Sequence, residues 1–266
     1  METPTQKVHR LTSYTWGWYQ PSREDDDLIW SVPVDDPRVV RGLETNDVDR
    51  FPWFFKRYAM ELPRVPLPRD LPATSAPAVA VLAGTADVSP TELGPPQLSR
   101  LLHLSAGVVR TTERPYATWF FRAAGSAGAR FPLEVYVAVP DGLGLPAGVH
   151  WYDPLDHALV QVGPPPRGDA PALVVTGVPW RTGWRYRERG YRHVYWDAGT
   201  MLSQLLAAAD SAGLTPRLHT RFPDAAVAGL VFPGDVRRVT GLDPASEEFA
   251  ERYADQLARL LAHLGR

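Results

Sequence analysis

The residues best suited to bind a ligand lie in one segment, residues 121–137. Glycine and alanine surround Ser126, so backbone amides there can approach a planar or anionic ligand closely, and Arg122 and Arg130 supply charged donors. A glycine-rich turn that only leads into a strand has the same composition. Residues 124–128 also differ by one residue from the nucleophile elbow of serine hydrolases, but that elbow runs from a strand directly into a helix. A strand-like run follows here instead, which argues against a hydrolase.

Arginines alternate with aromatic residues in a second segment, residues 180–196. Such a mixture can stack on single-stranded nucleic acid, or it can form a solvated face whose arginines lay their apolar stems along the protein. The chain carries a net charge of −2 and has a pI near 6.4, so no basic domain surrounds the segment. We therefore expect no nucleic-acid partner.

Scarce residue types exclude several chemistries. The chain has no cysteine, which rules out thiolate nucleophiles, disulfides and cysteine-ligated zinc or iron–sulfur sites. Only Lys7 and Lys56 are lysines, which argues against Schiff-base chemistry and phosphate-loop motifs. The seven histidines show no HxxxH or HExxH spacing, so we predict no metal site.

Strands are predicted in the middle of the chain, directly after the serine-containing segment. Their apolar runs cover residues 133–139, 148–152 and 158–162, with a hairpin turn at residues 153–156 between the last two. A fully apolar run at residues 172–178 predicts a buried central strand.

Helices are predicted on both sides of these strands. One opens at Ser89 and ends at Gly107, and a longer one follows Gly190 and ends at Gly213. The long helix is apolar over a wide arc, as expected for packing inside a core or a subunit interface. Three further elements complete an α+β fold: a strand over residues 217–222, a short helix from Asp224 and a terminal helix over residues 245–264.

The 266 residues are 44% apolar, which is enough for a substantial core. Residues 1–75, rich in Trp, Pro and Asp, predict an extended arm ordered by packing its aromatic rings, and residues 76–266 form the main domain. The N-terminus lacks the apolar stretch of a signal peptide, and no run approaches the roughly 18 apolar residues of a membrane span. We expect a cytoplasmic protein without a membrane partner.

Four blocks in a fixed order give the chain a family resemblance. These are RAAGSAGARFPLEVYVAV, LPAGVHWYDPLDHAL, WRYRERGYR and DAGTMLSQLLAAADSAGL, within about residues 98–230. They resemble the nitroreductase superfamily, and in particular its azoline dehydrogenases of the streptolysin and microcin type. The resemblance implies a sheet flanked by helices, antiparallel or mixed, with bound FMN at the interface of a homodimer. The long helix after Gly190 would be the dimer-core helix.

The resemblance also implies roles for individual residues. Ring oxidation in this family uses a Lys-Tyr pair near the flavin, and here the pair reads Arg185 and Tyr186, with Tyr186 as the proton acceptor. The residues implied to bind the flavin are Arg122, Ser126, Ala127, Gly128 and Arg189. Family members carry cations for the FMN phosphate before the first helix, whereas residues 79–88 contain none, and Arg237 and Arg238 are the nearest later candidates.

Two functions follow from these observations. The first is an FMN-dependent dehydrogenase that oxidises azoline rings to azoles in a ribosomally made peptide, with the modified precursor peptide and a cyclodehydratase as partners. The second is a flavin-free protein of the same fold that serves as a peptide-binding or scaffold subunit. The absent phosphate cations and the absent lysine favour the second function. The retained residues 122–134 and Tyr186 favour the first.

Overall fold

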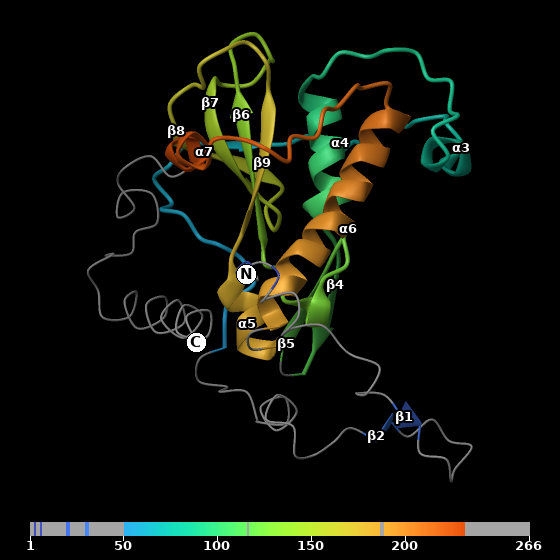
Figure 1. Cartoon of the computed structure of the whole chain (residues 1–266). Helices are drawn as coiled ribbons and strands as arrows, with labels where there is room; N and C mark the ends of the chain where they lie inside the picture. The colour runs from blue at the N-terminus through green and yellow to red at the C-terminus, as the bar shows by residue number, and fades with distance from the viewer. Residues whose placement is uncertain are drawn as a thin grey trace.

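The computed structural model describes residues 51–115, 117–186 and 189–231, together with positions 3, 6, 20–21 and 30–31. Helices and strands are mixed along the chain, and helices flank an antiparallel sheet (Figure 1), which confirms the predicted α+β class. In chain order the elements are β1 (Gln20–Pro21), β2 (Trp30–Ser31), β3 (Arg64–Pro66), α3 (Ala78–Leu82), α4 (Pro95–Ala106), β4 (Val108–Arg114), β5 (Ala117–Arg122), η3 (Ala127–Ala129), β6 (Leu133–Val139), β7 (Gly148–Asp153), β8 (Ala158–Gly163), β9 (Ala172–Gly177), α5 (Pro179–Tyr186), α6 (Gly190–Ser211) and α7 (Asp224–Val231).

The main sheet has five strands in the order β3-β8-β7-β6-β9, and every neighbouring pair is antiparallel. The predicted turn between β7 and β8 is confirmed. Asp153 Oδ1 accepts the backbone N–H groups of Leu155 and Asp156 at 3.0 and 3.3 Å, which tightens this turn. Every residue of β6 is buried, because both faces of this strand are covered.

Helices α4 and α6 lie on one face of the sheet (Figure 1). The odd-numbered residues of β6 meet Leu98 and Leu102 of α4 and Met201 of α6 in one apolar cluster. Helix α6 forms where the sequence predicts it and α4 forms over the later part of its predicted range, since their apolar residues recur at helical spacing. Gly107 ends α4, and Gly213, with φ +72°, follows the end of α6.

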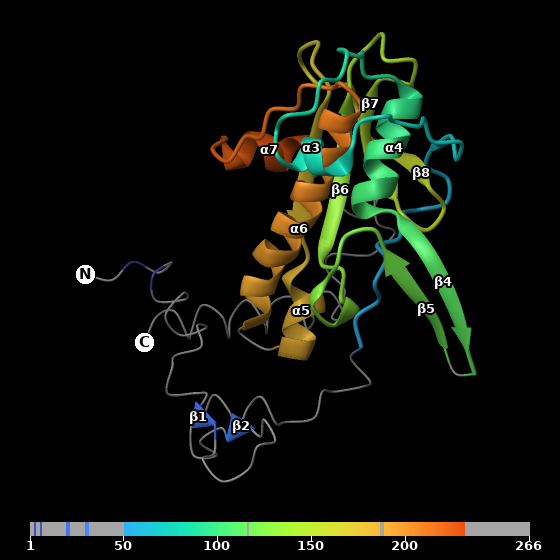
Figure 2. The ribbon, with the colours of Figure 1, turned by 90° about the vertical axis from the view of Figure 1, so that its right-hand side faces the viewer.

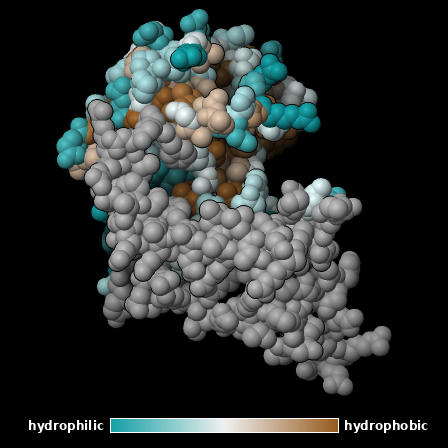
Figure 3. Space-filling view, turned by 60° about the vertical axis from the view of Figure 1, so that its left-hand side comes forward, coloured by the Kyte–Doolittle hydropathy of each residue, from teal (hydrophilic) through white to brown (hydrophobic). Residues whose placement is uncertain are grey.

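The other face of the sheet packs on the segment before β3 and on α7. Tyr136 of β6, Trp151 of β7 and Tyr58 form a second buried cluster with Val231 of α7. Helix α7 lies beside β8 (Figure 1), and the space-filling view toward this side shows hydrophobic surface between hydrophilic rims (Figure 3).

The apolar run at residues 172–178 forms β9, but the prediction of a central strand is wrong. Strand β9 pairs only with β6 among the described residues and is therefore an edge strand. Its side chains contact both clusters, through Val175 on one face and Val174 on the other. An apolar pattern reports covered faces, whereas lateral position depends on backbone pairing, which composition does not encode.

Two further boundaries differ from the prediction. Helix α4 begins at Pro95 rather than near Ser89, because Pro95 and Pro96 occupy its first positions while the N–H of Thr91 bonds to the carbonyl of Gly213. Residues 217–222 form no strand. They run from α6 to α7 with Leu218 and Phe222 about half exposed, and no described strand lies alongside to pair with them.

Strands β4 and β5 form a separate hairpin that the sequence analysis did not predict. It projects from the body beyond the end of α4 (Figure 2). Its two strands connect α4 to the loop that holds Ser126.

Several predictions fall outside the described residues: the terminal helix over residues 245–264 and the positions of Arg237 and Arg238. Within the described part, no helix combines the length and apolarity needed to cross a bilayer.

Candidate functional site

The loop between β5 and β6 has an unusual backbone. Gly128, Ala129 and Phe131 all adopt left-handed conformations, with φ of 57°, 52° and 46°. Glycine accepts such values readily, but an alanine and a phenylalanine do so at a cost of about 1–2 kcal/mol each. Strong restraints from the surrounding structure are therefore needed to hold residues 125–131.

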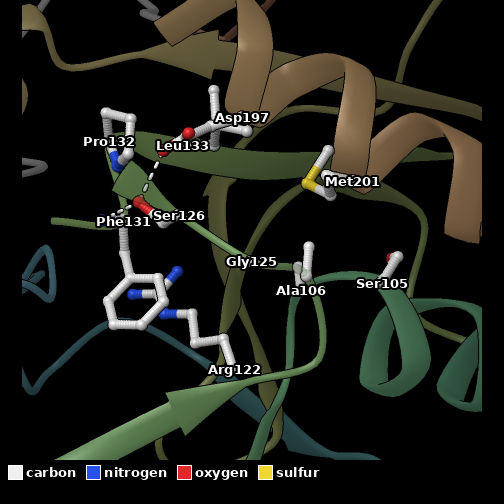
Figure 4. A pocket seen from close by; sticks show the side chains of 11 residues that line it. Ser105, Ala106, Arg122, Gly125, Ser126, Phe131, Pro132, Leu133, Asp197 and Met201 are labelled. Atoms are coloured by element: carbon white, nitrogen blue, oxygen red, sulfur yellow. Dashed lines mark hydrogen bonds between the residues drawn. The ribbon is translucent and has the colours of Figure 1, made fainter. Parts of the chain in front are cut away.

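The first restraint comes from α6. Ser126 Oγ donates to Asp197 Oδ2 at 2.5 Å (Figure 4). The N–H of Ala127 donates to Asp197 Oδ1 at 3.2 Å. The same hydroxyl accepts the N–H of Phe131 at 2.8 Å. Among the described residues Ser126 thus has a carboxylate and an amide as its partners and no imidazole base, and a single 3-10 turn follows it. Both findings exclude the nucleophile elbow.

The second restraint comes from α5. Arg181 donates from Nη1 to the carbonyl of Phe131 at 2.8 Å and forms an ion pair with Glu134 of β6. Trp151 Nε1 donates to the other oxygen of Glu134 at 2.7 Å. Arg181 is 5% exposed and Trp184 is 8% exposed, so the segment over residues 180–196 is not simply a solvated face.

Arg122 ends β5 at the mouth of the loop. Its guanidinium lies 4.9 Å from the ring centroids of both Phe55 and Phe131, and Nη2 donates to the carbonyl of Phe54 at 2.9 Å. Burial lowers the pKa of Arg122 to about 10. Its Nε is buried without a hydrogen-bond partner in the described part of the chain.

A shallow pocket lies between this loop, the end of α4 and the inner face of α6 (Figure 4). Its cavity volume is about 20 Å³, enough for a group the size of a water molecule. The residues that line it are Ser105, Ala106, Arg122, Ala124, Gly125, Ser126, Phe131, Pro132, Leu133, Asp197 and Met201.

Tyr186 reaches the same loop from the last turn of α5. A Cβ built on Gly128 would lie 2.5 Å from the Tyr186 hydroxyl, so glycine is what permits this close approach. Tyr186 also packs on His193 of α6, with ring centroids 4.4 Å apart. The adjacent Arg185 is exposed.

The structure brings some of the predicted site residues together and separates others. Arg122 and Ser126 line the pocket, and Gly128 contacts Tyr186. Arg189, directly before α6, lies over the ring of Trp196 at 5.3 Å and does not line the pocket.

Two residues of the site were missed by the sequence analysis, Asp197 and His193. Both lie on the buried stripe of α6, one turn apart, at positions where the helical pattern otherwise predicts apolar residues. Both ring nitrogens of His193 are buried without a partner among the described residues. Burial, together with the charges of Arg189 and Arg192, lowers the pKa of His193. A polar residue in an apolar helical stripe was the available signal.

Among the described residues, no group of three or more histidine, aspartate or glutamate side chains is arranged to hold a metal ion.

The chain is similar to proteins that are named as putative nitroreductases. No protein-family model matches the chain. A protein of Methanocaldococcus jannaschii named as a putative nitroreductase is 32% identical over 133 residues, which is 44% of this chain and 64% of that protein. The crystal structure of a protein from Anabaena variabilis, also named as a putative nitroreductase, aligns with a TM-score of 0.62 and 24% identity. The alignment covers 88% of this chain and 44% of that one. The chain has a nitroreductase-like fold.

The similarity also has limits. The chain spans less than two thirds of the Methanocaldococcus protein and less than half of the Anabaena chain. A chain of the E. coli microcin synthetase McbBCD complex, solved with truncated pro-MccB17 bound, aligns with a TM-score of 0.44 and 18% identity, over 90% of this chain and 86% of that one. A TM-score below 0.5 is too low to establish a shared fold.

Proposed function

We propose that this protein is an FMN-dependent oxidoreductase that oxidises azoline rings to azoles in a modified precursor peptide. The observation that carries the proposal is the contact between the Tyr186 hydroxyl and Gly128. It joins the one tyrosine that the family resemblance marks as a proton acceptor to the loop that the same resemblance marks for the flavin. These residues are 58 positions apart and come from different elements. The nitroreductase-like fold supports the redox chemistry.

The residues at the loop suit one edge of a flavin. The positive charge of Arg122 lies at the pocket wall, where it favours a ring oxygen or nitrogen, and nothing lies within 4 Å of a Cβ built on Gly125. A cavity of about 20 Å³ is far smaller than the roughly 300–1,000 Å³ of typical cofactor sites. Most of the ring system would therefore lie on the surface of this chain and need a second surface to cover it. A homodimer supplies that surface in the proposal.

A bound flavin supplies a hydride acceptor. Oxidation of an azoline ring removes a hydride from one ring carbon and a proton from the adjacent ring carbon. Tyr186, as its phenolate, would take that proton and become the phenol, so its oxygen must face the substrate across Gly128. Arg130 interacts electrostatically with both Tyr186 and Arg185, which places positive charge around this oxygen. Arg122 would orient the ring edge, while Asp197 and Arg181 keep the loop in place.

The flavin-free scaffold remains a second candidate because of a specific observation. Residues 79–88, where the family places a phosphate-binding cation, contain none, and α3 within them has Val79 and Leu82 about 80% exposed. A phosphate without cationic partners loses charge-assisted bonds worth roughly 1.5–3 kcal/mol each. A cofactor held by its ring edge alone would bind weakly.

The absorption spectrum of the purified chain after FMN addition and desalting separates the two functions. The oxidoreductase proposal expects retained bands at about 370 and about 450 nm, with about one flavin per chain. A spectrum without these bands at saturating FMN would reject it in favour of the scaffold.

The proposed proton acceptor is tested by Tyr186→Phe. We expect turnover of an azoline peptide to fall roughly 10²-fold with flavin still bound, because the phenyl ring keeps the packing on His193 and loses the acceptor. Tyr195→Phe removes the hydroxyl of an exposed tyrosine on α6 and serves as the control. Turnover that matches wild type in the Tyr186 variant would remove this residue from the mechanism.

A further inference from the structure

Asp197, on the buried stripe of α6, contacts the loop through its carboxylate. The sequence analysis assigned this residue no role. Asp197 is 6% exposed and lines the pocket beside Ser126. Its hydrogen bonds within the described residues go to the Ser126 hydroxyl and the Ala127 N–H, and it forms no ion pair there. A buried carboxylate held only by neutral donors is costly, which makes a purely packing role a poor explanation.

The contacts of Asp197 extend through the loop to Arg122. Ser126 Oγ, held by Asp197, accepts the N–H of Phe131. The ring of Phe131 in turn stacks on the guanidinium of Arg122. Because Phe131 has φ +46°, this backbone would relax toward an ordinary conformation if its amide were released. The amide of Phe131 is therefore held by the carboxylate through Ser126, whereas its carbonyl is held by Arg181.

We propose that Asp197 is the positioning residue of the pocket: through Ser126 it holds the strained loop in the conformation that forms the pocket wall beside Arg122. The carboxylate acts through the loop, because both of its oxygens accept hydrogen bonds from it. Only the identity of the pocket's ligand rests on the proposed function. The loop geometry stands on hydrogen bonds that exist without any cofactor.

Arg181 and Asp197 hold opposite ends of the loop. Arg181 holds the carbonyl of Phe131 and is neutralised by Glu134, so that end of the loop is fixed to the sheet. Within the described part of the chain, the end near Ser126 has no such connection to the sheet. Loss of Asp197 is therefore expected to release residues 125–131 while β6 stays in place.

Amide hydrogen exchange of the full-length protein without added flavin tests this directly. In Asp197→Asn and in Ser126→Ala, exchange over residues 125–131 is expected to rise about tenfold or more, while exchange in β6 and α4 stays at the wild-type rate. The double variant should exchange no faster than the faster single variant, because both changes break the same contact. Ser126→Thr, which keeps the hydroxyl, is expected to retain slow exchange. Asp210→Asn, on the exposed face of the same helix, is the matched control.

Two outcomes would overturn the proposal. One is wild-type exchange over residues 125–131 in both single variants. The other is a rise of equal size in β6 and α4, which would mean that Asp197 only stabilises the fold.

FMN retention provides a separate readout. If the wild-type chain retains flavin, Asp197→Asn is expected to weaken retention about tenfold and Ser126→Thr to preserve it. Retention equal to wild type in Asp197→Asn would also overturn the positioning role. If the wild-type chain retains no flavin, the proposed function fails, and the exchange experiment alone still decides the role of Asp197.

Discussion

At the residue scale, the geometry of the site depends on the lack of a side chain at position 128. Gly128 is left-handed and sits against the Tyr186 hydroxyl, so a methyl group there faces both a conformational cost and a steric overlap. Gly125, three residues earlier, has open space around it and no left-handed requirement. The two glycines of this loop therefore differ in role, although the sequence analysis described both only as small residues around Ser126.

Gly128→Ala is expected to lower the free energy of unfolding by about 1–2 kcal/mol from backbone strain, plus the cost of displacing Tyr186. In a Tyr186→Phe background the same change should cost about 1 kcal/mol less, because the overlapping oxygen is gone. Urea titration of the four proteins measures this coupling, with Gly125→Ala as the control. Equal costs in the two backgrounds would show that the contact with the hydroxyl is unimportant.

At the element scale, a hydrogen-bonded chain joins the β7–β8 turn to α4. Tyr152 Oη lies 2.8 Å from His157 Nδ1, His157 Nε2 lies 2.8 Å from Ser99 Oγ, and Ser99 donates to the carbonyl of Pro68. These contacts suit a neutral His157 in which Tyr152 donates to Nδ1 and Nε2–H donates to Ser99. Burial, with the charges of His103 and Arg69, lowers the pKa of His157 below 6.5.

Because the folded protein favours neutral His157, its contribution to stability is present above about pH 6.5 and is lost as the pH falls from there toward the lowered pKa. We expect His157→Gln to be less stable than wild type at pH 7.5 by about 1–3 kcal/mol, with the difference shrinking toward pH 5. Urea titrations across this range check the prediction, with the exposed His219→Gln as the control. A difference that stays constant with pH would contradict it.

At the scale of the whole molecule, the described end of the predicted arm is built into the core. Strand β3 pairs with β8 at the edge of the sheet. Lys56 Nζ donates to the hydroxyl of Tyr136 at 2.7 Å, and the hydroxyls of Tyr58 and Tyr136 are 2.8 Å apart. Phe55, which stacks on Arg122, is 4% exposed. Residues 51–75 thus support both the second face of the sheet and one wall of the site.

Deletion of residues 1–75 is expected to give a less stable protein than deletion of residues 1–50. The longer deletion removes β3 and uncovers Tyr136 and the edge of β8. Thermal unfolding and sedimentation of the two truncated proteins measure stability and oligomeric state. Indistinguishable behaviour of the two would show that residues 51–75 do not contribute to the assembly.

The sequence by itself determined the elements whose patterns are local. Helix α6 and strands β6, β7 and β8 follow from apolar periodicity and from turn residues a few positions apart. The loop around Ser126 was also singled out from composition, because small residues and arginines stand side by side there; its role in ligand binding stays a prediction.

Only the tertiary structure decided which residues meet. The bond between Ser126 and Asp197 spans 71 positions, and no local pattern couples them. The edge position of β9 and the left-handed conformation of Phe131 likewise depend on neighbours distant in the chain. Short-range spacing specifies which face of an element is buried, whereas the partner of that face is set by how the elements pack, and the geometry of the site resides in that packing.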